Sequence, residues 1–197
     1  MAVSKGVSLS RIAEAVEAGL EVLGENRVQE AAAKIPQLPP ARWHLVGRLQ
    51  GNKAARALEL FESIHSVDSV DLAGRLDRLA AGRSSPYPVF LQVDVDGDEA
   101  KAGFSPMALQ DQLPRLASLA NLELRGLMTI GRMADSPEAA RPTFAALRDL
   151  AHRLRSRDER LGDGLSMGMS ADFEVAVEEG ATVLRIGRAL FGARPRV

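Results

Sequence analysis

The chain has no cysteine among its 197 residues, which excludes a disulfide framework, thiolate metal ligands and a cysteine nucleophile. An excess of one charge is also missing, since 25 basic residues face 26 acidic ones. We therefore expect no nucleic acid and no membrane surface as a partner, and any anionic ligand must be held by a local site. No apolar run reaches the ~18 residues of a membrane-spanning helix, and the first residues do not have the order of a signal peptide. These absences favour a cytoplasmic protein.

Apolar runs alternate with amphipathic, alanine-rich stretches along the whole chain, as is typical of βα units and a parallel sheet. The pattern predicts strands at residues 2–5, 21–26, 43–47, 63–67, 88–95, 122–130, 165–169 and 182–186. It predicts helices at residues 8–18, 28–34, 53–60, 70–81, 107–119, 137–157 and 171–179.

Eight such units without a long linker predict an α/β protein, a single (β/α)8 TIM barrel that occupies residues 1–197 as one domain. An open, doubly wound sheet is the alternative, and it would separate the first strand from the last. A barrel usually covers the seam between these two strands with a helix, and no helix is expected before residue 2. We therefore expect an uncovered seam or a seam covered by another subunit.

The C-terminal strand ends form the functional face of such barrels. Lys5 is the only lysine that ends a predicted strand. Among apolar barrel walls the charged form of a lysine is disfavoured, so its amine becomes a nucleophile suited to a Schiff base with an aldehyde. The alternative is that the Lys5 side chain simply reaches solvent.

The segment at residues 186–192 follows the last strand and fits the phosphate site that barrels often place there. Gly187 permits close approach of the backbone to a ligand, and Ser166 and Ser170 on the neighbouring strand could add hydroxyl groups. Each of these residues could equally serve only in a turn.

Several motifs, taken together, resemble one family. They are AVSK (2–5), GEN (24–26), VQE (28–30), WHLVGRLQ (43–50), NK (52–53), HSVDS (65–69), KAGF (101–104), RGLMTI (125–130), LSMGMSADF (165–173) and RIG (185–187). In this order they are similar to the pyridoxal phosphate homeostasis proteins, which are single-domain barrels related to the N-terminal domain of alanine racemase. Members of the family usually have a helix before the first strand, which this sequence lacks.

The resemblance implies that Lys5 forms the internal aldimine with pyridoxal 5'-phosphate. It implies that Ser166 and Ser170, with the backbone at Gly187 and Arg188, bind the phosphate, and that Arg185 faces the pyridine nitrogen. Residues implied to lie beside the cofactor are Asn26, His44, Met128 and Met169.

For two of these residues, Asn26 and His44, a hydrogen bond that closes a loop is an equally good interpretation. His65 is assigned to strand packing and His152 to an exposed helix face. The scattered histidines do not have the spacing of a zinc site, so no metal is expected.

The resemblance implies a carrier that holds the cofactor and delivers it, with apoenzymes as transient partners and a monomer as the expected state. An arginine at the pyridine nitrogen weakens the ring as an electron sink. Racemisation also needs a second acid or base, and the only tyrosine, Tyr87, is predicted at the opposite end of the barrel. A racemase that uses His44 or a water, or a barrel enzyme that binds a phosphorylated metabolite, are the alternatives.

Overall fold

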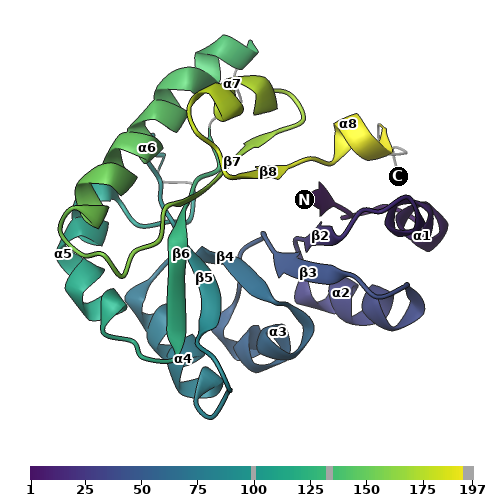
Figure 1. Cartoon of the computed structure of the whole chain (residues 1–197), viewed down its shortest axis with the longest axis horizontal. Helices are drawn as coiled ribbons and strands as arrows, with labels where there is room; N and C mark the ends of the chain where they lie inside the picture. Colours follow the sequence, from purple (N-terminus) through teal and green to yellow (C-terminus); the bar gives the residue numbers. More distant parts are fainter. Residues whose placement is uncertain (99–100, 132–134, 193–197) are drawn as a thin grey trace.

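The computed structural model describes residues 1–98, 101–131 and 135–192. Its parallel strands form one sheet in the order of the sequence, from β1 to β8 (Figure 1). The strands are β1 (Ala2–Val3), β2 (Val22–Glu25), β3 (Arg42–Leu45), β4 (Ser63–Val67), β5 (Tyr87–Gln92), β6 (Leu122–Met128), β7 (Gly164–Met169) and β8 (Val183–Arg185).

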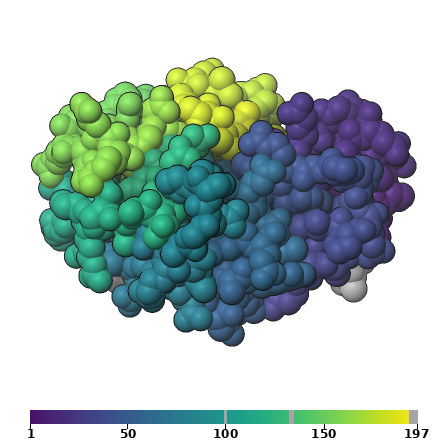
Figure 2. Space-filling view, turned by 60° about the horizontal axis from the view of Figure 1, so that its bottom comes forward, coloured from purple at the N-terminus to yellow at the C-terminus, as the bar shows by residue number. Residues whose placement is uncertain are grey.

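Backbone contacts join the first strand to the last. Ala2 forms a parallel bridge with Ile186, and the Val3 N–H donates to the Ile186 carbonyl at 2.8 Å. The first and last segments of the chain accordingly lie side by side in the ribbon and on the surface (Figures 1 and 2). The predicted barrel is therefore confirmed, and the open, doubly wound sheet is excluded.

Helices surround the sheet on its outer side (Figure 1). The α-helices are α1 (Leu9–Glu17), α2 (Val28–Lys34), α3 (Ala54–Leu60), α4 (Val70–Ala80), α5 (Pro106–Ala117), α6 (Arg141–Arg155), α7 (Phe173–Glu178) and α8 (Arg188–Phe191). The short 3-10 helices are η1 (Ile35–Gln37), η2 (Gly51–Lys53) and η3 (Pro137–Ala140).

Helix α4 shows how the sequence produces this layer. The Ser69 hydroxyl accepts the Leu72 N–H at 3.3 Å and so caps the first turn. Leu72 and Leu76 are buried against the sheet, whereas Leu79, which the helical spacing assigns to the same face, is 42% exposed. In the last turn of α4 the buried position is therefore Ala80, at 1% exposure, and not Leu79.

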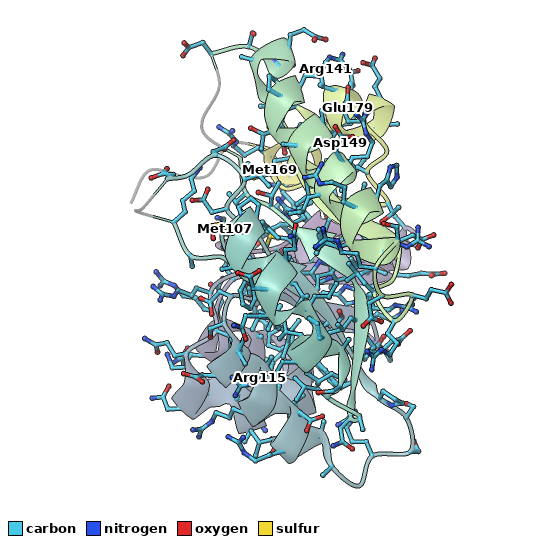
Figure 3. The ribbon with its side chains drawn as sticks, turned by 90° about the vertical axis from the view of Figure 1, so that its left-hand side faces the viewer. Met107, Arg115, Arg141, Asp149, Met169 and Glu179 are labelled. Carbon is cyan, nitrogen blue, oxygen red and sulfur yellow. The ribbon has the colours of Figure 1, made fainter. Side chains whose placement is uncertain are left out.

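Ion pairs connect α6 to η3 and to the end of α7. Arg141 in α6 contacts Glu138 and both Glu178 and Glu179 at the end of α7, and Arg148 also pairs with Glu179. Figure 3 shows Arg141 and Glu179 close together at one end of the molecule. This network holds α7, and with it the loop that follows β7, against the long helix α6.

Candidate functional site

A pocket of about 560 Å³ opens where β1, β2, β6, β7 and β8 end. The predicted site residues that line it are Lys5, Asn26, Met169, Ser170, Arg185, Gly187 and Arg188. Val3, Val46 and Ile130 add apolar walls. The closure of the barrel brings residues from both ends of the chain, Lys5 and Arg188, into this one pocket.

The backbone around Lys5 is fixed by a cluster of charged side chains. Lys34 Nζ donates to the Ser4 carbonyl at 2.8 Å, to Glu25 at 2.8 Å and to Glu30 at 2.6 Å. The Ser4 hydroxyl donates to the fully buried Glu25, and the Gly6 N–H donates to Glu30 at 2.8 Å. Both neighbours of Lys5 are therefore held by α2 and the end of β2.

The electrostatics of Glu30 reflect this arrangement. Burial by itself would raise the pKa of the Glu30 carboxyl, but hydrogen bonds from Gly6 and Lys34 outweigh it and lower that pKa. The sequence analysis missed this cluster. One part of the cluster could have been predicted, because Glu30 and Lys34 are four residues apart on one helix and such a spacing favours an ion pair.

Arg185 forms the inner wall of the pocket. Its Nη1 donates to the Ser166 carbonyl at 2.6 Å and to the Ser166 hydroxyl at 3.0 Å, and its Nη2 donates to the Thr129 carbonyl at 2.8 Å. Burial lowers the pKa of Arg185 to about 10, against a smaller opposing effect of Asp172, so the guanidinium stays charged at neutral pH.

A chain of hydrogen bonds continues from Arg185 into the barrel interior. Ser166 Oγ lies 2.9 Å from His65 Nδ1, and His65 Nε2 lies 3.0 Å from His44 Nδ1. The His65 ring stacks on Phe90 at 4.3 Å between centroids. Burial lowers the pKa of His44 to about 4 and lowers that of His65 strongly, so both imidazoles are neutral at pH 7.

Three predicted site residues therefore lie away from the pocket lining. Ser166 is fully buried, and its hydroxyl lies between Arg185 and His65. His44 is half-buried and contacts His65, and Met128 is fully buried in β6. His65, assigned from the sequence to strand packing, is the polar link between Ser166 and His44.

Donors for an anion gather on one side of the pocket. The Ser170 hydroxyl accepts the N–H of Gly187 at 3.2 Å and that of Ala189 at 3.1 Å. Arg188 lines the same part of the pocket. Both N–H groups donate to Ser170 Oγ in this structure, so the Ser170 hydroxyl proton and the Arg188 guanidinium are the donors that face a phosphate group.

The only tyrosine lies at the other end of the barrel, as the sequence predicts. Tyr87 is the first residue of β5 and is buried, and its hydroxyl donates to the Phe61 carbonyl at 2.6 Å. Burial raises the pKa of this phenol, so it stays protonated.

Among the helices that the structure describes, none is long and apolar enough to cross a membrane. Within the same residues, no group of three His, Asp or Glu side chains is placed to hold a metal ion.

The fold and this pocket define the class of barrels built like the N-terminal domain of alanine racemase. A family model described as "Alanine racemase, N-terminal domain" matches residues 1–195. The alanine racemase of Clostridium difficile has the same fold with a TM-score of 0.80 at 16% identity, over 99% of this chain and 52% of that one.

Relatives of higher sequence identity place the chain in one family within this class. The chain is 42% identical to the pyridoxal phosphate homeostasis protein of Aquifex aeolicus over 97% of this chain and 85% of the relative. It is 43% identical to the protein of that name from Pseudomonas aeruginosa over 98% and 84%, respectively. The structure of PipY from Synechococcus elongatus with pyridoxal phosphate bound matches with a TM-score of 0.91 at 44% identity, over 98% of this chain and 91% of that one. The chain belongs to the pyridoxal phosphate homeostasis protein family.

Proposed function

We propose that this protein binds pyridoxal 5'-phosphate in the pocket between Lys5 and Arg185 and serves in the homeostasis of that cofactor. One observation carries the proposal. A single pocket of about 560 Å³ is lined by an amine, Lys5, by a buried guanidinium, Arg185, and by the anion donors around Ser170 and Gly187. These groups match the aldehyde, the ring nitrogen and the phosphate of the cofactor.

Each residue has a part in this proposal. Lys5 would hold the cofactor covalently, because its amine can condense with an aldehyde with release of water. Ser170, Gly187 and Arg188 hold the phosphate, while Asn26 and Met169 flank the ring. Ser166, His44 and Met128 act from behind this lining, where Ser166 holds the Arg185 guanidinium in place.

The same geometry favours a carrier over an enzyme. The charged guanidinium of Arg185 disfavours a proton on the ring nitrogen, and an unprotonated ring is a poor electron sink. Tyr87 is occupied by the Phe61 carbonyl and lies at the opposite end of the barrel, so it does not serve as a second acid or base. We therefore propose a monomeric cytoplasmic protein that holds the cofactor and hands it transiently to apoenzymes.

The test is to reduce the loaded protein with borohydride and to locate the cofactor by mass spectrometry. The parent should gain one cofactor at Lys5 and show a visible absorbance band, whereas Lys5→Ala should gain none. Lys5→Arg keeps the positive charge but cannot form the bond, so it should also gain none. A labelled Lys5→Arg protein would refute the role of Lys5, and amino-acid stereoinversion that depends on Lys5 would refute the carrier.

A further inference from the structure

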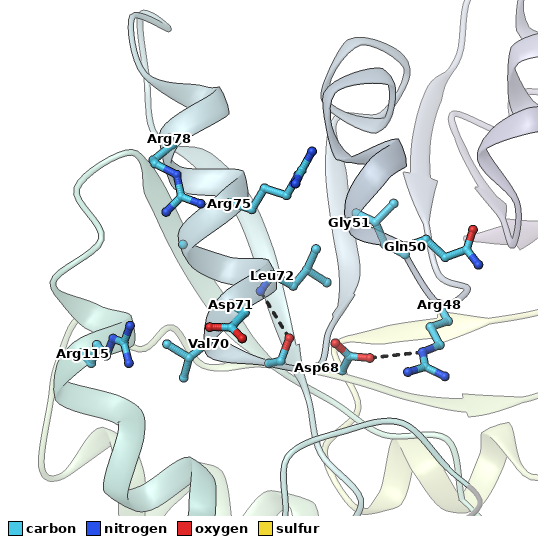
Figure 4. A pocket seen from close by; sticks show the side chains of 13 residues that line it. Arg48, Gln50, Gly51, Asp68, Val70, Asp71, Leu72, Arg75, Arg78 and Arg115 are labelled. Carbon is cyan, nitrogen blue, oxygen red and sulfur yellow. Dashed lines mark hydrogen bonds and ion pairs between the residues drawn. The ribbon is translucent and has the colours of Figure 1, made fainter.

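A second hollow, of about 750 Å³, lies beside the loops that follow β3 and β4 (Figure 4). Four arginines surround it, and they come from three segments of the chain. Arg48 follows β3, Arg75 and Arg78 project from α4, and Arg115 comes from α5. Two carboxylates, of Asp68 and Asp71, lie between them.

Most of this positive charge is not neutralised within the protein. Arg48 contacts Asp68 at 3.5 Å, and the side chain of Arg48 is 76% exposed. Within the described ranges, the guanidinium groups of Arg75, Arg78 and Arg115 form no ion pair and no hydrogen bond. Their donors are therefore available to an external group.

A third depression lies between this hollow and the candidate cofactor pocket. It shares Arg48 and Gln50 with the arginine-lined hollow and shares Asn26 with the cofactor pocket. The three hollows together form one basic face. Its cationic residues are Lys5, Arg27, Arg48, Lys53, Arg75, Arg78, Arg115, Arg185 and Arg188.

The charge of this face is opposite to that of the rest of the chain. Nine of the 25 basic residues line it but only two of the 26 acidic ones, which leaves 16 basic and 24 acidic residues elsewhere. A protein with a net charge of -1 thus concentrates positive charge around the mouth of its pocket. Such a distribution attracts and orients a negatively charged partner.

We propose that the arginine-lined hollow is a docking site for an acidic segment of a protein partner. This identification rests on the proposed function: the partner is the apoenzyme that receives the cofactor. An acidic segment seated at Arg75 and Arg78 places the acceptor beside the cofactor pocket. The cofactor can then pass between the two proteins without diffusing away.

The lining of the basic face favours an acidic protein segment over other anions. Arginine forms two parallel hydrogen bonds to carboxylates and phosphates alike, but the four arginines are spread over three segments of the chain, which suits several carboxylates along a peptide and not one compact anion. No Phe, Trp or Tyr lines the three hollows as described, whereas single-stranded nucleic acids are bound on aromatic side chains.

The experiment measures binding of a fluorescent hexaglutamate peptide at low ionic strength. The parent should bind the peptide, and Arg75→Gln/Arg78→Gln should weaken binding roughly three- to thirtyfold, as two exposed ion pairs predict. The control is Arg153→Gln/Arg157→Gln, which removes the same charge from exposed positions at the end of α6 and should bind like the parent.

Four results would overturn the proposal. They are an absence of peptide binding to the parent, an equal loss in both double variants, displacement of the peptide by inorganic phosphate at matched ionic strength, and tighter binding of a single-stranded DNA dodecamer. Borohydride fixation of the cofactor at Lys5 is measured on the same proteins and should be equal in all three. Peptide binding at the arginines without fixation at Lys5 would support the docking site and refute the proposed function, and the reverse result would refute the docking site alone.

Discussion

His65 Nδ1 lies 2.9 Å from the hydroxyl of Ser166, although the two residues are 101 positions apart in the chain. This contact crosses the barrel interior from β4 to β7. It determines which atom donates at each hydrogen bond between Arg185, Ser166, His65 and His44. Arginine only donates, so Ser166 accepts from Arg185 and its own proton is left for His65. The opposite direction would leave the buried Ser166 hydroxyl without an acceptor among the described residues.

We therefore predict that both histidines carry their proton on Nε2. His65 then donates from Nε2 to Nδ1 of His44 across 3.0 Å. Long-range ¹H–¹⁵N NMR spectra at pH 7 distinguish the two neutral tautomers directly. A signal from the Nδ1–H form of either residue would reverse the assigned direction, and in Ser166→Ala the His65 signal should change while the exposed His152 signal should not.

The same histidines should make stability depend on pH. The pKa of His44 is lowered from 6.5 to about 4 by burial and by Arg42, so between these values the unfolded chain binds a proton that the folded protein does not. Stability is then unaffected above pH 6.5 and falls as the pH drops toward 4, by up to about 1.4 kcal/mol per pH unit for each histidine.

Urea unfolding at pH 7, 6, 5 and 4.5 checks this dependence. His44→Gln should flatten the loss of stability below pH 6.5, whereas His152→Gln, on the surface of α6, should follow the parent. The prediction fails when the His44→Gln and parent curves stay parallel.

Lys34→Met should destabilise the protein by roughly 3 kcal/mol, because it leaves the fully buried Glu25 carboxylate without its cation. Lys53→Met, at a partly exposed position with no ion pair among the described residues, is the control for stability and should change it by less than about 0.5 kcal/mol. Hydrogen exchange should also become faster at Gly6, whose N–H is held by Glu30. Adding Glu25→Gln to Lys34→Met should recover part of the loss, and a further loss would contradict the ion pair as its cause.

Gly47→Ala should disturb the wall of the pocket at Asn26. A Cβ atom at residue 47 would lie 2.2 Å from the Asn26 carbonyl oxygen and 2.7 Å from its Cα, so the two loops must separate. We expect a loss of roughly 1–3 kcal/mol in unfolding free energy and weaker retention of the cofactor. Gly74→Ala is the control for stability, because its Cβ meets only Arg78 at 3.6 Å and should be neutral or stabilising. Equal stabilities of the two variants would contradict the close approach.

The order of strands and helices is a local property, and it could be predicted from the sequence. Apolar runs of strand length alternate with amphipathic stretches of helix length, and only a barrel brings the first and last of these strands together. Lys5 at the end of β1 and Gly187 after β8 followed from this order alone. Ser170 was suggested by its place on the neighbouring strand, and the remaining pocket residues were found because their motifs resemble those of a family.

The register of the strands decided which side chains reach the pocket, and the tertiary structure alone shows it. The pairing of β7 with β8 shifts between Ser166 and Met169, and Gly168 between them has φ +86°. This irregularity leaves Ser166 in the barrel interior and Met169 in the pocket lining, whereas the sequence assigned both to the cofactor. The hydrogen bonds of Lys34 and of His65 likewise join segments distant in sequence, because they depend on how the barrel closes and not on any local pattern.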